Sequence, residues 1–144
     1  MSQDELRSLF EAARWASSYN EQPRRYVVAR RDDRVQFERL LSCLVEGNQA
    51  WAKHVPVLAL GIVSRKFAKN GKDNRAAVRD LGLAAGNLVV EATARGLRVH
   101  QSGSFPTRRQ KSLESRKATR HEPELRSATK VIPPRCRTIS SGAT

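Results

Sequence analysis

"RDLGLAAGNLVVEATARGLRVHQ" (Arg79–Gln101) is the stretch of sequence that decides the fold. Apolar residues recur in it at helical spacing and form one continuous stripe, Leu81, Ala84, Ala85, Leu88 and Ala92. This spacing predicts a long helix over residues 74–95, with Gly96 as its terminating residue. The next residues, "LRVH" (Leu97–His100), begin a strand.

The predicted long helix is apolar on more than one face, because Leu83 and Val90 lie outside the main stripe. A helix of this kind is either central to the core or half of a subunit interface. Gly82 and Gly86, four residues apart, lower helix propensity but allow another element to approach closely. The sequence pattern leaves both interpretations open.

Helical and extended patterns also alternate upstream of this helix. Apolar periodicity predicts helices over 4–16 and 32–44, and β-branched or apolar runs predict strands over 25–30 and 55–63. Residues 46–54 form a turn or short helix, and polar loops cover 17–23 and 64–74. The strand over 55–63 is apolar enough to be buried on both faces. Alternation of helices and strands places the chain in the α/β or α+β class.

The regular pattern stops after His100. Residues 101–144 contribute +7 of the formal net charge of +13, and their apolar residues are scattered. We therefore expect a partial domain over 1–101 and a basic, disordered tail over 102–144. Because the excess charge concentrates in the tail, the folded part is not predicted to be a basic binding module.

The composition excludes several classes of protein. Two cysteines, Cys43 and Cys136, are too few for a disulfide framework or a zinc site, and His54 and His100 have no partners at metal-ligand spacing. The start of the chain lacks the features of a signal peptide, and the longest apolar run, over 55–63, is too short to span a bilayer. We expect a soluble, cytoplasmic protein with no metal site.

The predicted loop "SSYNEQP" (Ser17–Pro23) is unusually rich in hydroxyl and amide groups. Taken alone, it is a polar helix-to-strand connection with an Asx-type turn. The alternative is a loop whose side chains hold the edge of a flat polar ring. An amide such as Asn20 offers both a donor and an acceptor to such an edge.

Three separated segments together favour the second interpretation. "LFEAARWASSYNEQP" (Leu9–Pro23), "NQAWAKHVPVLALGIV" (Asn48–Val63) and "RDLGLAAGNLVVEATARGLRVHQ" (Arg79–Gln101) occur in the order typical of the nitroreductase family, which the chain resembles. The resemblance extends over residues 6–101.

The resemblance implies an α+β fold, a three-layer sandwich, that forms homodimers and binds FMN at the subunit interface. It also implies hydride transfer from NAD(P)H, as co-substrate, through the flavin to nitroaromatic, quinone or similar small-molecule acceptors. The predicted flavin contacts are Ser17, Ser18, Asn20 and Gln22, in the segment that resembles the family's flavin loop. The redox chemistry belongs to the flavin, so no catalytic side chain is expected.

The sequence departs from the family pattern at several points. The proline usually found before the two serines is missing, and Arg24 replaces the family's tryptophan. A preceding Arg-Ser-x-Arg motif, which grips the FMN phosphate in the family, is also absent. We therefore expect an incomplete fold, truncated at both ends, that folds poorly and binds FMN weakly or not at all.

The tail suggests a further hypothesis based on the genetic code. Codons for residues 113–121, read two nucleotides out of phase, permit GIPEGYEA, and the same offset over 130–140 permits GDPASLPDDL. Both strings resemble the C-terminal part of nitroreductases. The tail after residue 101 is then a frameshifted translation, which the coding DNA around Gln101 tests directly.

Two alternatives to an active flavoenzyme stay open at this point. One is a non-enzymatic basic protein that binds nucleic acid through its tail, but the tail offers only Phe105 as a stacking aromatic residue, so we do not expect nucleic acid as a partner. The other is an inactive nitroreductase fragment.

Overall fold

The computed structural model describes residues 1–102 and 123–132. Among these residues, helices and strands alternate along the chain as the sequence predicts. In chain order they are α1 (Gln3–Arg14), β1 (Arg24–Arg30), α2 (Arg34–Leu41), α3 (Glu46–Ala52), β2 (Val57–Ser64), α4 (Ala77–Ala94), β3 (Arg98–Ser102) and β4 (Pro123–Ile132).

The strands form one sheet in the order β1-β2-β4-β3, in which all neighbouring strands are antiparallel. β2 lies inside the sheet and pairs with β1 from Arg24↔Val63 to Arg30↔Val57. Most of β2 is buried, which confirms the prediction of a strand covered on both faces. Its continuous apolar sequence is therefore explained by two cores rather than one.

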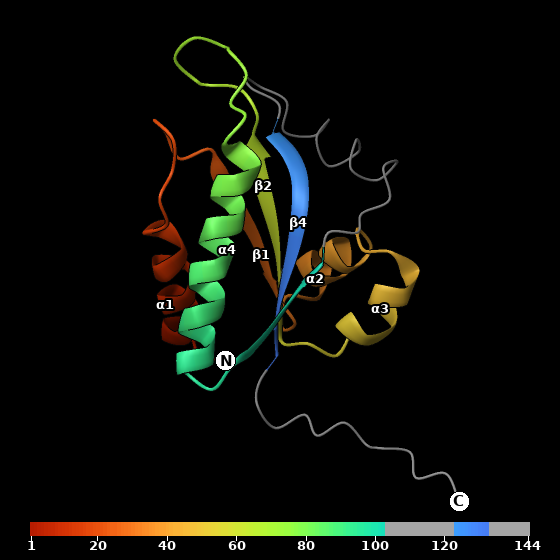
Figure 1. Cartoon of the computed structure of the whole chain (residues 1–144). Coiled ribbons are helices and arrows are strands. Elements are labelled where there is room, and N and C mark those ends of the chain that lie inside the picture. The colour runs from red at the N-terminus through yellow and green to blue at the C-terminus, as the bar shows by residue number, and fades with distance from the viewer. Residues whose placement is uncertain (103–122, 133–144) are drawn as a thin grey trace, which may run out of the picture.

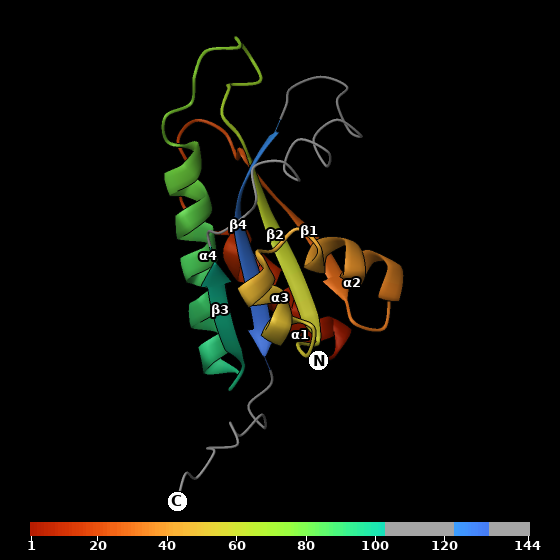
Figure 2. The same ribbon diagram turned by 90° about the vertical axis from the view of Figure 1, so that its right-hand side faces the viewer.

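Helices cover both faces of the sheet. α1 and α4 lie side by side on one face, and α2 and α3 lie on the other (Figures 1 and 2). The first face is packed through Leu9, Leu88 and their neighbours, and the second through Phe37, Leu40 and theirs. This is the predicted α+β arrangement of three layers.

Local signals explain where the two helices of the first layer begin and end. Ser2 and Glu5 form a capping box at the start of α1. α4 ends in a Schellman motif, in which Gly96 adopts φ +70° and Leu97 N–H donates to the Ala92 carbonyl at 2.8 Å. The predicted terminating role of Gly96 is thus confirmed.

The predicted elements are present, with shifted ends. The long helix covers 77–94 rather than 74–95, and the helix expected over 32–44 covers only 34–41, with Asp33 as its N-cap. Residues 46–52 form a short helix, the second of the two alternatives considered. Such differences are ordinary at helix ends, which are the least determined part of an element.

Residues 123–132 differ from the sequence expectation of an irregular tail. They form β4, which pairs with β2 on one side and with β3 on the other. Only this pairing places β3 in the same sheet as β2. The remaining tail residues, 103–122 and 133–144, lie outside the described residues, and the frameshift hypothesis stays a prediction.

α4 combines a buried stripe with an exposed apolar face. The five predicted stripe residues are all buried, and they contact α1 and the sheet. The solvent-exposed side, here called the α4 outer face, includes Val78, Gly82, Leu83, Gly86 and Val90; the three large side chains are 42%, 45% and 69% exposed. A Cβ at either glycine would meet nothing within 4 Å in the described part of the chain. No helix among the described residues has both the length and the apolar character needed to cross a bilayer.

Two leucines of α4 test this division into faces. Leu88 is fully buried, whereas Leu83 is 45% exposed. We expect Leu88→Ala to lower the free energy of unfolding by about 2–5 kcal/mol, because it removes packed methyl groups and leaves a cavity. Leu83→Ala is the matched control and should cost less than about 1 kcal/mol in dilute solution. Urea denaturation followed by circular dichroism measures both, and equal losses would contradict the assignment.

Candidate functional site

The four residues predicted as ligand contacts lie together in the loop between α1 and β1, residues 15–23, here called the α1–β1 loop. Ser17, Asn20 and Gln22 are exposed, and Ser18 is half-buried. None of the four side chains forms a hydrogen bond with another residue that the structure describes. Their hydroxyl and amide groups are therefore available to a bound molecule.

Asn20 sits at the sharpest point of the loop. Its φ is +61°, the only positive value among the described residues other than glycine. The Glu21 N–H donates to the Tyr19 carbonyl at 2.8 Å, which closes a tight three-residue turn around Asn20. Asparagine tolerates this left-handed conformation better than most residues. The turn fixes the backbone from which the Asn20 amide projects.

A buried cation holds the start of the loop. Arg24 is only 6% exposed, and its Nη2 donates to the carbonyls of Ala16 at 2.7 Å and Arg14 at 3.0 Å. The Arg14 carbonyl belongs to the last residue of α1, where backbone acceptors have no helical partners, and Ala16 follows two residues later. The guanidinium therefore caps α1 from β1. Arg24 stands where the family has a tryptophan. These charge-assisted hydrogen bonds offset the apolar packing that the tryptophan would supply.

A buried anion holds the middle of the loop. Asp80, in the first turn of α4, is fully buried, and its Oδ2 accepts the Tyr19 N–H at 2.9 Å. Its Oδ1 pairs with the Arg79 guanidinium at 2.8 Å. Because both carboxylate oxygens have donors, the buried charge is compensated. The contact ties the α1–β1 loop to α4, 61 residues further along the chain.

The second half of the loop is held by the segment that follows β2. Ser64 N–H donates to the Pro23 carbonyl at 2.8 Å, which extends the ladder between β1 and β2. Glu21 Oε2 accepts the Ala68 N–H at 3.1 Å, and the rings of Tyr19 and Phe67 lie 6.0 Å apart. The loop thus has anchors at its start, middle and end.

Two polar atoms beneath the loop are buried without a hydrogen-bond partner among the described residues, Arg24 Nη1 and Tyr26 Oη. Burial raises the pKa of Tyr26 to about 12, and the nearby Arg24 cation opposes that rise. The phenol is therefore neutral at physiological pH and able to donate a hydrogen bond.

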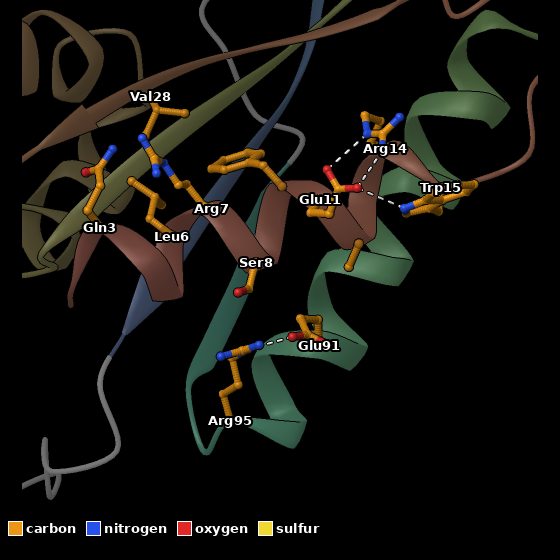
Figure 3. Close-up of a pocket in the computed structure, with 12 residues that line it drawn as sticks. Gln3, Leu6, Arg7, Ser8, Glu11, Arg14, Trp15, Val28, Glu91 and Arg95 are labelled. Carbon is orange, nitrogen blue, oxygen red and sulfur yellow. Dashed lines mark hydrogen bonds and ion pairs between the residues drawn. The ribbon is translucent and has the colours of Figure 1, made fainter.

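A separate open groove of about 880 Å³ runs along the outer side of α1 (Figure 3). Its lining includes Arg7, Arg14, Trp15 and Arg95 but none of the four predicted contacts. Arg14 pairs with Glu11, and Arg95 pairs with Glu91, so each of these cations is neutralised on its own helix. The groove offers no comparable set of unpartnered amides and hydroxyls.

The chemistry available in the α1–β1 loop is recognition by neutral hydrogen-bonding groups. Two hydroxyls and two carboxamides can donate to and accept from the edge of a polar ring. The sequence predicted these four residues as ligand contacts, which stays a prediction, and it did not identify Arg24 and Asp80 as residues that hold the loop. The signal for Asp80 was a lone carboxylate in an otherwise apolar helical stripe, a position that acidic residues occupy when they have partners.

The sequence model described as "Nitroreductase family" matches residues 1–119 of the chain. No curated protein sequence matches.

Solved structures resemble the chain more broadly. An oxidoreductase containing FMN is 25% identical, with a TM-score of 0.80, and the match covers 92% of this chain and 67% of that one. A Desulfovibrio desulfuricans protein in complex with FMN is 22% identical, with a TM-score of 0.73. That match covers 100% of this chain and 81% of that one. An FMN-dependent nitroreductase from Clostridium difficile R20291 is 15% identical, with a TM-score of 0.75. That match covers 99% of this chain and 82% of that one.

Arg24 can be tested against its exposed neighbour Arg25. We expect Arg24→Met to lower the free energy of unfolding by about 2 kcal/mol or more, because it leaves buried carbonyls without a donor. Arg25→Met removes a cation from the exposed side of β1 and should cost less than about 1 kcal/mol. Urea denaturation of both variants makes the comparison. If Arg24→Met is as mild as Arg25→Met, the cap does not hold the loop.

Proposed function

The chain belongs to the nitroreductase family, and from that premise we propose that it is an FMN-dependent oxidoreductase that takes hydride from NAD(P)H. The acceptors are nitroaromatic compounds, quinones or similar small molecules. The α1–β1 loop, through Ser17, Ser18, Asn20 and Gln22, holds the flavin.

The observation that carries the proposal is the contrast between the backbone and the side chains of this loop. Arg24 and Asp80 fix its backbone, while its four polar side chains have no partner among the described residues. A loop built only to connect two elements has no need of buried charges to hold it. Rigid backbone beneath unpartnered donors and acceptors is the arrangement that lowers the entropic cost of binding.

The residues present fit the edge of an isoalloxazine ring. That edge alternates carbonyl acceptors with an N–H donor, and the Asn20 carboxamide offers the complementary donor and acceptor. Ser17 and Ser18 supply hydroxyls that can donate or accept, and Gln22 supplies a second carboxamide. When bound, FMN supplies the hydride chemistry, and the protein contributes binding and orientation.

Flavin titration tests the proposal on the full chain. The double variant Asn20→Gly/Gln22→Ala should weaken FMN binding by about tenfold or more, because each lost polar contact contributes about 0.5–1.5 kcal/mol. Glycine at position 20 keeps the positive φ available, so the amide is removed without new backbone strain. Gln36→Ala, an exposed carboxamide of α2, is the matched control and should leave affinity unchanged.

Quenching of flavin fluorescence measures the affinities, and oxidation of NADH or NADPH with a quinone measures turnover. A folded chain that binds no FMN at millimolar concentration would contradict the proposal and support the inactive-fragment alternative. The nucleic-acid alternative depends on tail residues that lie mostly outside the described ranges, and nothing in the described residues favours it.

We further propose that the chain pairs with a second copy through the α4 outer face, as the family resemblance implies. Val78, Leu83 and Val90 leave apolar surface in water on this face. Gly82 and Gly86 have open space above them, so a facing helix can approach closely. A second copy would bury this surface in the way that a helix interface does.

A charge placed on this face should separate the copies. We expect Val90→Asp to shift the protein to a monomer, because a carboxylate buried in an apolar interface is strongly unfavourable. Val35→Asp is the matched control, because Val35 is 61% exposed and lies in the first turn of α2, where an acidic residue is tolerated. Sedimentation velocity measures both. A Val90→Asp variant that sediments like the wild type would contradict the assignment of this interface.

A further inference from the structure

The loop between β2 and α4 carries a dense group of cations. Residues 65–75, here called the cationic loop, hold Arg65, Lys66, Lys69, Lys72 and Arg75 and a single carboxylate, Asp73. All six are exposed. Lys66, Lys69, Lys72 and Arg75 take part in no ion pair with the described residues.

The cationic loop has a defined backbone rather than an extended path through solvent. Lys66 and Asp73 form an antiparallel bridge, and Phe67 N–H donates to the Lys72 carbonyl at 2.8 Å. Asn74 is buried at the base, where its N–H donates to the Arg65 carbonyl at 2.6 Å. The positions from which the lysines project are therefore set before any ligand arrives.

This loop is joined to the α1–β1 loop that carries the proposed flavin contacts. Ala68 N–H donates to Glu21 Oε2 at 3.1 Å, and the Phe67 ring packs near the Tyr19 ring. Figures 1 and 2 both show the two loops at the same end of the molecule, beyond the start of α4. These contacts involve Tyr19 and Glu21, the two neighbours of Asn20, and on the other loop Phe67 and Ala68, which lie between Lys66 and Lys69 in the sequence.

We propose that the cationic loop binds a phosphate group of a nucleotide whose ring is held by the α1–β1 loop. This inference rests on the proposed function. The shared chemistry is a phosphate monoester, either the 5′-phosphate of FMN or the 2′-phosphate of NADPH. A preorganised set of ammonium groups with one carboxylate nearby favours a dianion over a neutral group at the same place.

Four ligands separate the two sources. Isothermal titration of the wild-type chain with FMN and riboflavin reports on the flavin phosphate, and titration with NADP⁺ and NAD⁺ reports on the 2′-phosphate. In one of the two pairs, we expect the ligand that carries the phosphate (FMN or NADP⁺) to bind about tenfold more tightly than the ligand that lacks it (riboflavin or NAD⁺). A tenfold difference corresponds to one charge-assisted contact. The triple variant Lys66→Gln/Lys69→Gln/Lys72→Gln should abolish that preference and leave riboflavin affinity within about twofold.

The matched control is Arg34→Gln/Arg39→Gln/Lys53→Gln, which removes the same charge from exposed positions in and next to α2 and α3. It should keep the preference, since a general effect of net charge would act equally in both variants. Circular dichroism confirms that both triple variants are folded.

The outcomes separate this inference from the proposed function. Equal FMN-to-riboflavin and NADP⁺-to-NAD⁺ ratios in the wild type and the Lys66/Lys69/Lys72 variant would overturn the phosphate role, even if the flavin binds. A different result is a wild-type chain that binds neither FMN nor riboflavin and still prefers NADP⁺ to NAD⁺, with a preference that the Lys66/Lys69/Lys72 variant loses. That result would overturn the flavin site alone. A wild-type chain that binds none of the four ligands would overturn both.

Discussion

The α1–β1 loop depends on two buried charges of opposite sign that belong to different elements. Arg24 reaches from β1 to the Arg14 carbonyl at the end of α1 and to the Ala16 carbonyl beyond it, and Asp80 reaches from α4 to the Tyr19 N–H. Each charge is costly to bury. Both Asp80 oxygens have donors, and Arg24 Nη2 donates to backbone carbonyls, whereas Arg24 Nη1 has no partner among the described residues. The loop can therefore keep its own side chains unpartnered, because its shape does not depend on them. The residues that hold the loop are therefore distinct from the four that we propose as flavin contacts.

Much of the fold was predictable because its signals are local. The stripe on α4 and the terminating Gly96 act through neighbours in the sequence, so periodicity and residue type were sufficient to find them. The four polar residues of the loop were proposed from composition and from resemblance to a family, and their role as flavin contacts stays a prediction. What was missed acts over long separations. Neither the Arg24 cap nor the contact between Asp80 and Tyr19 produces a periodic pattern in the sequence.

β4 is an element that the local sequence pattern did not predict. Its sequence, "PELRSATKVI", has scattered apolar residues and no strong strand pattern. The structure nevertheless places it between β2 and β3, where it has hydrogen-bonding partners on both sides. A strand inside a sheet gains backbone pairing that no local propensity reveals. Context outweighs composition at this position.

β1 lies at the edge of the described sheet, with only β2 beside it. An unpaired strand edge is a template on which foreign strands can add, the first step of fibril growth. Here the apolar centre of the strand, "YVVA", lies between Arg25 and Arg30. Cations at both ends act as gatekeepers, because stacking a second copy in register would bring like charges together. The same arginine-rich composition that resembles a nucleic-acid signal therefore opposes amyloid-like aggregation along this edge.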